Sequence, residues 1–329
     1  MKNLLFLFCF QFLLSQNISP EEKFTAYQNY INLAKFEFYK KDYKKSGILF
    51  KKAFSFHSAD DSYDLLDAAA SALYNGENDL AEKYIAESIT DHRAPLEFIM
   101  GYEKLKNYEN SSFLEELPDL YDAYFNAFYA KRKNLQAYLA ADLLMEKDQM
   151  IRNLITDLDN NPEETQATKK LIYQELDRTD EKNAQELIEL TKKYGYQDRA
   201  WLLLWHHRGQ KYENTSSPFW QFFKPVIEKE IKEGRLHKSF FAPFEEENYA
   251  DLHQKQKYGL FPQMYMENPI DDLKNVDKLR EEAGLPPLSF DIIVKGYPQP
   301  DGYNASESDL RKELERRVSK YEMIEFHGN

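Results

Sequence analysis

The chain has 329 residues, of which 42% are hydrophobic and 15% aromatic, and it contains only 11 glycines. This composition excludes an intrinsically disordered polymer and a collagen-like fibre. Lysine and arginine number 43 against 56 acidic residues, which gives a formal net charge of −13. Because an acidic protein is repelled by phosphate backbones, we expect no nucleic-acid partner.

The first fifteen residues are predicted to be a signal peptide. Lys2 precedes an apolar run at residues 4–14, and the small Ser15 follows it. This order is typical of secretory signals, and the run is shorter than the roughly 20 residues that a membrane span needs. We therefore predict cleavage near Ser15/Gln16, export to the periplasm or the medium, and no transmembrane anchor. The alternative is an N-terminal core helix. The single cysteine, Cys9, lies inside this segment, so the exported chain would carry no thiol.

Residues 16–145 are predicted to form paired helices. Ser19-Pro20-Glu21-Glu22 is a helix start, and apolar residues then recur at spacings of three and four. Two copies of one pattern follow at a period of 35 residues, from Ser46 to Ala81. Its members are Tyr30, Leu33, Ala34, Asp42, Tyr43, Ser46, Phe50 and Ala53, then Leu65, Ala68, Ala69, Gly76, Glu77, Asn78, Ala81, Ile85 and Ser88.

This pattern resembles the tetratricopeptide repeat, whose small residues let two helices pack closely and whose period is about 34 residues. Glu37 and Ala72 depart from it, since an aromatic residue is usual at their position. Residues 95–117 suggest a degenerate third copy, and residues 121–144 a capping helix. The capping segment carries an aromatic face that serves either as core or as a peptide-binding groove, formed by Tyr121, Tyr124, Phe125, Phe128 and Tyr129.

Five short motifs succeed one another in residues 146–290. They are Asp148-Gln149 with Arg152; Asp180 and Asn183 on a helix that Thr179 is predicted to cap and that ends at Tyr194-Gly195-Tyr196; Ala200-Trp201-Leu202-Leu203 ending at His206; Gln256-Lys257-Tyr258-Gly259; and Val276-Asp277 with Arg280 before Gly284-Leu285-Pro286-Pro287-Leu288.

This succession resembles a bacterial family catalogued as domain of unknown function 6624. The resemblance implies a domain and candidate residues but no reaction, because the family has no established activity. The chain departs from it in three places: a shortened connection at Gln197-Asp198-Arg199, a reversed charge at Glu246-Glu247, and Leu260-Phe261 where polar residues are usual.

A polar site around His206 and Asp180 is one hypothesis for this half. His206 would act as a base and Asp180 would orient it, with Asn183, Gln256, Tyr258 and Arg280 as ligand-binding candidates. The competing interpretation is structural: histidines and acids favour the C- and N-terminal ends of helices, and tyrosine and arginine satisfy buried partners. Because His206 and His207 are adjacent, their rings diverge on a helix, so we expect no metal and no cofactor.

The sequence thus predicts an all-α protein with a signal peptide at 1–15, helical hairpins at 16–145, a mainly helical domain with Pro-rich loops at 146–290, and a loop and helix at 291–329. We expect the tail stripe of Leu310, Leu314, Val318 and Tyr321 to dock on the body. The leading functional expectation is a protein- or peptide-binding module that uses the helical repeat surface. The alternative is an extracytoplasmic, hydrolase-like enzyme, and the sequence leaves open whether the protein is an enzyme at all.

Overall fold

The structure is a computed structural model that describes residues 18–106, 108, 111–160, 166–322 and 324. These residues form sixteen α-helices and three short 3-10 helices, and they contain no strand, so the predicted all-α class is confirmed. The predicted signal peptide lies outside the described residues. Within the described part of the chain, no helix is both long and apolar enough to cross a membrane.

The chain divides into two compact units. The first unit contains the described residues up to 131 together with 231–240 and the described residues from 257 onward, and the second contains 132–230 and 241–256. The predicted boundaries at 145/146 and 290/291 stay predictions, although position 145 lies inside a continuous helix.

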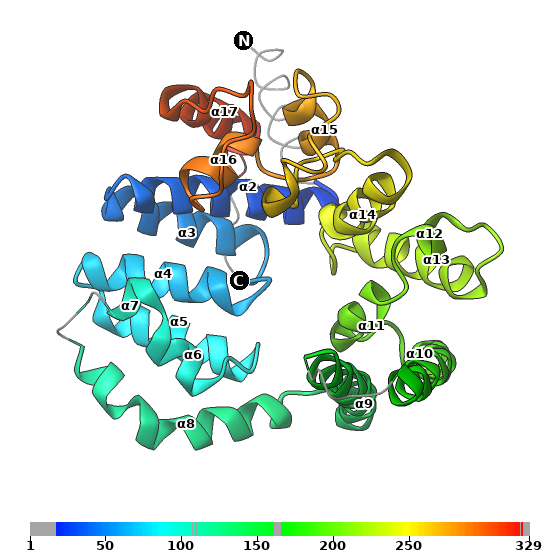
Figure 1. The fold of residues 1–329 in the computed structure, drawn as a ribbon. Coiled ribbons are helices and arrows are strands. Elements are labelled where there is room, and N and C mark those ends of the chain that lie inside the picture. Colours follow the sequence, from blue (N-terminus) through cyan, green and yellow to red (C-terminus); the bar gives the residue numbers. More distant parts are fainter. Residues whose placement is uncertain (1–17, 107, 109–110, 161–165, 323, 325–329) are drawn as a thin grey trace, which may run out of the picture. The chain divides into compact units, whose positions relative to one another are not determined.

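The first unit is a stack of helical hairpins (Figure 1). Its first helix starts with a capping box, in which the Ser19 hydroxyl accepts from the Glu22 amide and the Glu22 carboxylate accepts from Ser19. Consecutive helices pack as hairpins, and α5 packs on α8. Their assignment as tetratricopeptide repeats stays a prediction. The helices are α2 (Pro20–Tyr39), α3 (Tyr43–Phe56), α4 (Ser62–Tyr74), α5 (Asn78–Thr90), α6 (Leu96–Gly101), α7 (Glu103–Lys106) and α8 (Ser112–Ala130).

The tail of the chain covers the outer side of the first hairpin. Helix α17 (Glu307–Ser319) is capped by Ser306 and packs on α2, as Figure 1 shows at the other end of the stack from α8. The predicted apolar stripe is buried in the core that α2 to α8 share, as expected: its members are Leu310, Leu314, Val318 and Tyr321. The first unit also contains η3 (Pro262–Met264), α15 (Val276–Glu282) and α16 (Leu288–Ile293).

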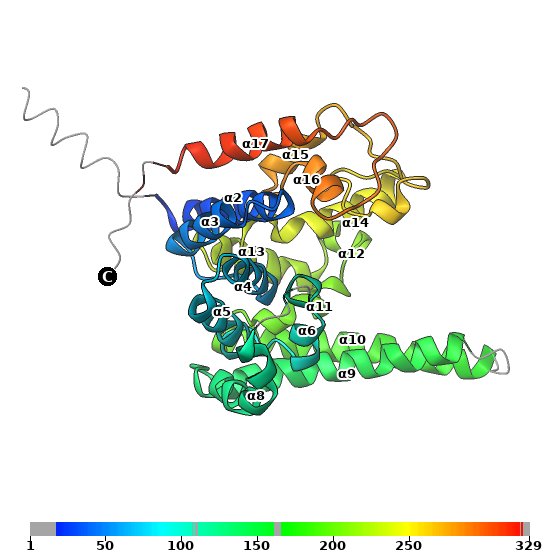
Figure 2. The same cartoon turned by 90° about the vertical axis from the view of Figure 1, so that its left-hand side faces the viewer.

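The second unit is built on two long helices, α9 (Leu135–Asp159) and α10 (Gln166–Tyr194), which lie side by side as an antiparallel pair (Figure 2). Asn134 caps α9, and α10 stops before Gly195, whose φ of +83° suits glycine. Two predictions are wrong here. The helix containing Asp180 does not begin at Thr179, because α10 continues through it, and residues 121–144 are divided between α8 and α9.

Shorter helices complete the second unit. A 3-10 turn leads into α11, whose Trp201 and Trp205 rings stack 5.5 Å apart. Trp220 and Phe244 pack edge to face at 5.2 Å and join α13 to α14. The elements between α10 and residue 256 are η1 (Asp198–Ala200), α11 (Trp201–Trp205), α12 (Gln210–Glu213), α13 (Pro218–Lys232), η2 (Lys238–Phe241) and α14 (Ala242–His253), of which η2 and the end of α13 fall largely in the first unit.

Candidate functional site

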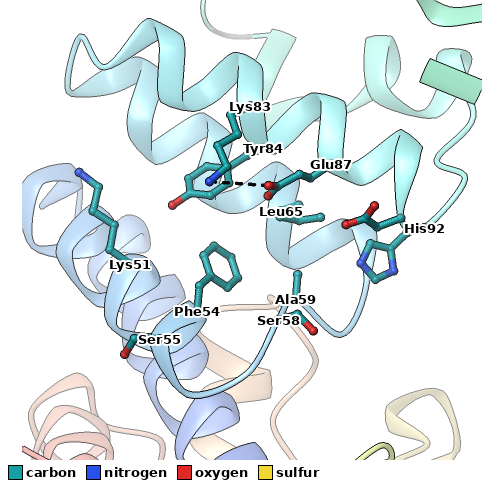
Figure 3. Close-up of a pocket in the computed structure, with 11 residues that line it drawn as sticks. Lys51, Phe54, Ser55, Ser58, Ala59, Leu65, Lys83, Tyr84, Glu87 and His92 are labelled. Carbon is teal, nitrogen blue, oxygen red and sulfur yellow. Dashed lines mark ion pairs between the residues drawn. The ribbon is translucent and has the colours of Figure 1, made fainter. Parts of the chain in front are cut away.

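A groove of about 520 Å³ lies between the second helices of the two hairpins, α3 and α5, with the start of α4 and the α3–α4 loop at one side (Figure 3). We call it the α3–α5 groove. Its lining residues are Lys51, Phe54, Ser55, Ser58, Ala59, Leu65, Lys83, Tyr84, Glu87, Asp91 and His92.

The floor of the groove is apolar and aromatic. Phe54 projects from α3 toward Tyr84 on α5, with ring centroids 5.3 Å apart, and Leu65 lies beside them. Tyr84 and Leu65 are almost fully buried, whereas Phe54 keeps partial exposure. Burial raises the pKa of Tyr84 to about 12, with smaller effects of Glu87 and Glu77, so the phenol is neutral at physiological pH. The floor is therefore a hydrophobic surface with one hydroxyl.

Charges of both signs line the edges of the groove. Lys83 lies 3.7 Å from Glu87, one turn later on α5, and Lys51 on the opposite wall lies 2.8 Å from Glu77. All four side chains are more than a third exposed, so water screens both pairs and either lysine can change partner at small cost. Ser55 and Ser58 add hydroxyl groups (Figure 3). The groove is thus neither uniformly charged nor uniformly apolar.

A buried tyrosine positions the loop that borders the groove. The Tyr27 hydroxyl accepts from the Asp60 amide at 2.9 Å and donates to Asp64. Because Asp61 also caps α4 by accepting from the Asp64 amide, the loop after α3 is tied to two helices. The shape of the groove therefore depends on the core of the hairpin stack.

A second polar arrangement, which we call the His206 network, occupies the second unit. The Nδ1 atom of His206 lies 2.9 Å from Asp148 Oδ1 and 3.0 Å from Arg152 Nε. Arg152 also donates to Asp180 at 2.7 Å. Nδ1 donates to Asp148 when it is protonated and accepts from Arg152 when it is not, so these two bonds exclude each other.

Asp148 is the buried centre of the His206 network. Burial opposes its ionisation, but the hydrogen bond and charge of His206, with help from Gln149 and Arg152, hold its pKa below the ordinary value.

The neighbouring His207 behaves differently. Burial, reinforced by Lys211, lowers its pKa to about 4, and its ring packs 4.1 Å from Phe219. His207 is therefore a neutral packing residue, and His206 is the histidine that contacts charge.

Two of the remaining candidates, Asn183 and Arg280, have structural roles. Asn183 is buried and its amide donates to the Leu144 carbonyl oxygen at 3.4 Å. Arg280, in the first unit, is fully buried and donates to the carbonyl oxygens of Tyr258 and Pro286 and to Asp291. Gln256 is fully buried in the second unit. The structure thus brings together Asp180 and His206, through Arg152, and assigns Tyr258 and Arg280 to the other unit.

Sequence reasoning missed Asp148 and Arg152 as site residues, although they stand four apart on one helix and so share a face. It also missed the α3–α5 groove, since its walls come from two hairpins.

Among the described residues, no group of three or more His, Cys, Asp or Glu side chains is arranged to hold a metal ion. Protein-family models, curated proteins and solved structures yield no match to this chain.

Proposed function

We propose that the protein binds a peptide or a segment of another protein in the α3–α5 groove, as an exported interaction module. The observation that carries this proposal is the combination of an aromatic floor and exposed charged edges in one groove of about 520 Å³. Binding sites of this kind gain affinity from an apolar side chain that is buried centrally, and specificity from polar groups around it.

The chemistry of the groove suggests what it accepts. Phe54, Leu65 and Tyr84 suit one apolar or aromatic side chain of the bound segment. Lys51 on α3 and Lys83 on α5 suit carboxylates of the bound segment, and Glu87, which pairs with Lys83, suits a cation. An extended segment with a central hydrophobic residue between charged neighbours is therefore the proposed ligand.

The test is selection from a random peptide library displayed on phage, followed by calorimetry with the selected peptides. Ser55→Arg places a long cation into the groove from its exposed edge and should abolish their binding. The matched control is Thr156→Arg on α9, because both hydroxyls bond a carbonyl of their own helix and both side chains are exposed. Selection of no peptide, or equal binding by Ser55→Arg and wild type, would refute the proposed function.

A second candidate is the extracytoplasmic, hydrolase-like enzyme with a site around His206 and Asp180. It is favoured by one observation: three of the motifs that resemble domain of unknown function 6624 contribute to the His206 network. A histidine held by a carboxylate through Nδ1 has the arrangement of a general base, and no described residue bonds its Nε2 atom.

A thermal-shift screen with metal ions and small polar ligands tests this candidate. Any ligand that acts through the His206 network should stabilise wild type and fail to stabilise His206→Ala. Asp148→Asn should weaken the same response, since it removes the acceptor of the Nδ1 proton. A ligand that stabilises all three proteins equally binds elsewhere, and that result would eliminate the candidate.

A further inference from the structure

His57 stands at the end of α3, and both nitrogens of its ring contact carbonyl oxygens. Its Nδ1 atom lies 2.6 Å from the Ser58 oxygen, and its Nε2 atom lies 3.0 Å from the Gly234 oxygen, which belongs to the same unit. A carbonyl oxygen can only accept a hydrogen bond, and a neutral imidazole carries a single N–H. Both contacts are therefore hydrogen bonds only when His57 is protonated at both nitrogens.

The Gly234 oxygen is a fixed partner for this ring. Gly234 has a φ of +68°, and a Cβ at this position would lie 2.6 Å from the carbonyl oxygen of Pro20. Its backbone is thus held against the first residue of α2, and it cannot follow a ring that moves. His57 consequently joins the α3–α4 loop to a rigid turn.

The surroundings of His57 favour the charged form of the ring. His57 is the C-cap residue of α3, where the helix dipole attracts a cation. Phe24 of α2 stacks on it with ring centroids 4.1 Å apart and planes 8° apart, so the aromatic face meets the imidazolium. The ring is half-buried, and water can therefore exchange its protons.

The neighbouring titratable groups on the packed elements are neutral or paired. Tyr27 on α2 lies 5.5 Å from the His57 ring, and burial raises its pKa well above its usual range. Burial lowers the pKa of His237, in the segment 231–240, to about 3. Glu233 and Arg235, on either side of the accepting glycine, pair with each other. These groups therefore keep their charge between pH 5.5 and 8.5, where a histidine ordinarily titrates.

Asp61 in the same loop titrates within that range, with the opposite effect. Burial, reinforced by Asp64, raises the pKa of Asp61 to about 6. Its carboxylate caps α4 by accepting from the Asp64 amide at 2.9 Å, so its protonation loosens the loop. Acid thus tightens the loop through His57 and loosens it through Asp61, which makes the two groups separable by experiment.

We propose that His57 is a pH-operated clamp on the α3–α5 groove, closed in its protonated form and released when the ring loses a proton. The proposal rests on the function proposed for that groove, whose border includes Ser58 and Ala59 (Figure 3). In a neutral ring, one contact becomes a repulsion between lone pairs. Repulsion is stronger at the shorter contact, so the remaining proton stays on Nδ1 and the bond to Gly234 is lost.

Release of the clamp changes the groove, because its border is no longer tied to the turn at Gly234. The bound segment fits the closed form, and its apparent affinity falls in proportion to the fraction of protein that is closed. Binding is therefore stronger in acid.

Nitrogen NMR of the full chain with isotope-labelled histidine tests the clamp without a ligand. Among the seven histidines, His57 is identified by its contacts with the Phe24 ring. Both ring nitrogens should carry protons at about pH 5.5, and only Nδ1 should do so at about pH 8.5. A ring that is neutral at the lower pH, charged at the higher pH, or protonated there on Nε2 would overturn the proposal.

Hydrogen exchange measures the loop itself. Protection factors of the amides at 58–61 should fall about tenfold in wild type from the lower to the higher pH, since a charge-assisted hydrogen bond is lost. His57→Gln should show no such fall. Asp61→Asn is the control that keeps the fall, because asparagine caps a helix without titrating. An equal fall in wild type and His57→Gln contradicts the clamp.

Calorimetry with a peptide selected for the groove measures the regulation. Wild type should gain about tenfold more affinity on acidification than His57→Gln does. Equal pH dependence in the two proteins would refute regulation of the groove by His57. Failure to select any peptide would refute the proposed function instead, while the NMR and exchange measurements still decide whether the clamp exists.

Discussion

Arg311 binds Glu37 with both terminal nitrogens of its guanidinium group, and so joins the last described helix of the chain to the first. The Nη2–Oε2 distance is 2.9 Å, and Lys45 lies 2.8 Å from the same carboxylate. Glu37 is almost fully buried on α2. A carboxylate in that environment needs partners, and Arg311 on α17 and Lys45 on α3 supply them.

Arg311→Ala should lower the free energy of unfolding by about 1–2 kcal/mol, because it leaves a buried carboxylate with a single lysine. Water screens this pair in part, because the Arg311 side chain is 35% exposed, and so the loss is modest. Urea unfolding measures the change, and hydrogen exchange should show α17 opening first. Lys312→Ala on the same helix is the control and should alter stability little, because its ion pair with Asp309 is exposed. Equal effects of the two variants would show that the Glu37 pair does not hold α17.

Lys35→Met should destabilise the hairpin stack by about 2–4 kcal/mol. Lys35 lies 2.6 Å from Asp64 and 3.7 Å from Asp67, and both carboxylates are almost fully buried on α4. Removing the cation leaves Asp64 with the Tyr27 hydroxyl, and Asp67 with the Tyr102 hydroxyl and Lys104. Equilibrium unfolding measures the loss, with the exposed Lys44→Met as control. A loss no larger than that of the control would contradict the prediction. It would mean that Lys104 balances the charges of Asp64 and Asp67 without Lys35.

His237→Gln should reduce the loss of stability that the protein shows in acid. Burial, assisted by Lys238 and His57, lowers the pKa of His237 to about 3, against an ordinary value of 6.5. Its Nε2 atom is buried and has no hydrogen-bond partner among the described residues, while Nδ1 lies 2.9 Å from the Ser239 hydroxyl. Between those two pKa values the unfolded chain binds a proton that the folded chain does not, so stability falls as the pH falls from 6.5.

At about pH 5, proton binding by the unfolded chain lowers the free energy of unfolding by about 2 kcal/mol. Well above pH 6.5 this loss is absent. Thermal unfolding of wild type and His237→Gln at about pH 7.5 and about pH 5 measures it. His253→Gln, which alters an exposed histidine, should keep the pH dependence of wild type. The prediction is refuted if His237→Gln loses as much stability on acidification as wild type does.

Arg152→Leu should destabilise the second unit by about 2–3 kcal/mol, because it deprives Asp148 and Asp180 of their shared cation. Arg178→Leu on α10 provides the comparison. Arg178 is 75% exposed and pairs with the exposed Glu175, so its loss should change stability within about 0.5 kcal/mol. Hydrogen exchange in α9 and α10 measures the stability of both variants, and Arg152→Leu should show the weaker protection. Similar protection in the two variants would contradict the prediction.

Local rules predicted much of the fold. Ser19 with Glu22 specified the start of α2, and Gly195 specified the end of α10. Thr179 was a false signal for a helix start, because a good capping residue is also tolerated inside a helix, and α10 continues through the half-buried Thr179. Capping signals indicate where a helix can begin, and tertiary packing decides whether it does.

Long-range contacts were beyond the sequence. Glu37 stood out as a departure from the repeat pattern, and only the structure shows its reason, since its partner Arg311 lies 274 residues away. Asp148 and Asp180 both bind Arg152, yet nothing in the sequence states that α9 and α10 face each other at that level. The α3–α5 groove was missed for the same cause, because hydrophobic periodicity reports which side of a helix is buried and not where two helices diverge.

The position of α17 has a consequence for the order of events during synthesis. The first hairpin, which ends at Phe56, leaves the ribosome early, but the helix that covers its outer side begins only at Glu307, about 250 residues later. Until then Glu37 has no Arg311, and the surface that Leu310, Leu314 and Val318 later cover faces water. Closure of the amino-terminal core is therefore among the last steps of folding, and the nascent chain needs protection from premature association over that interval.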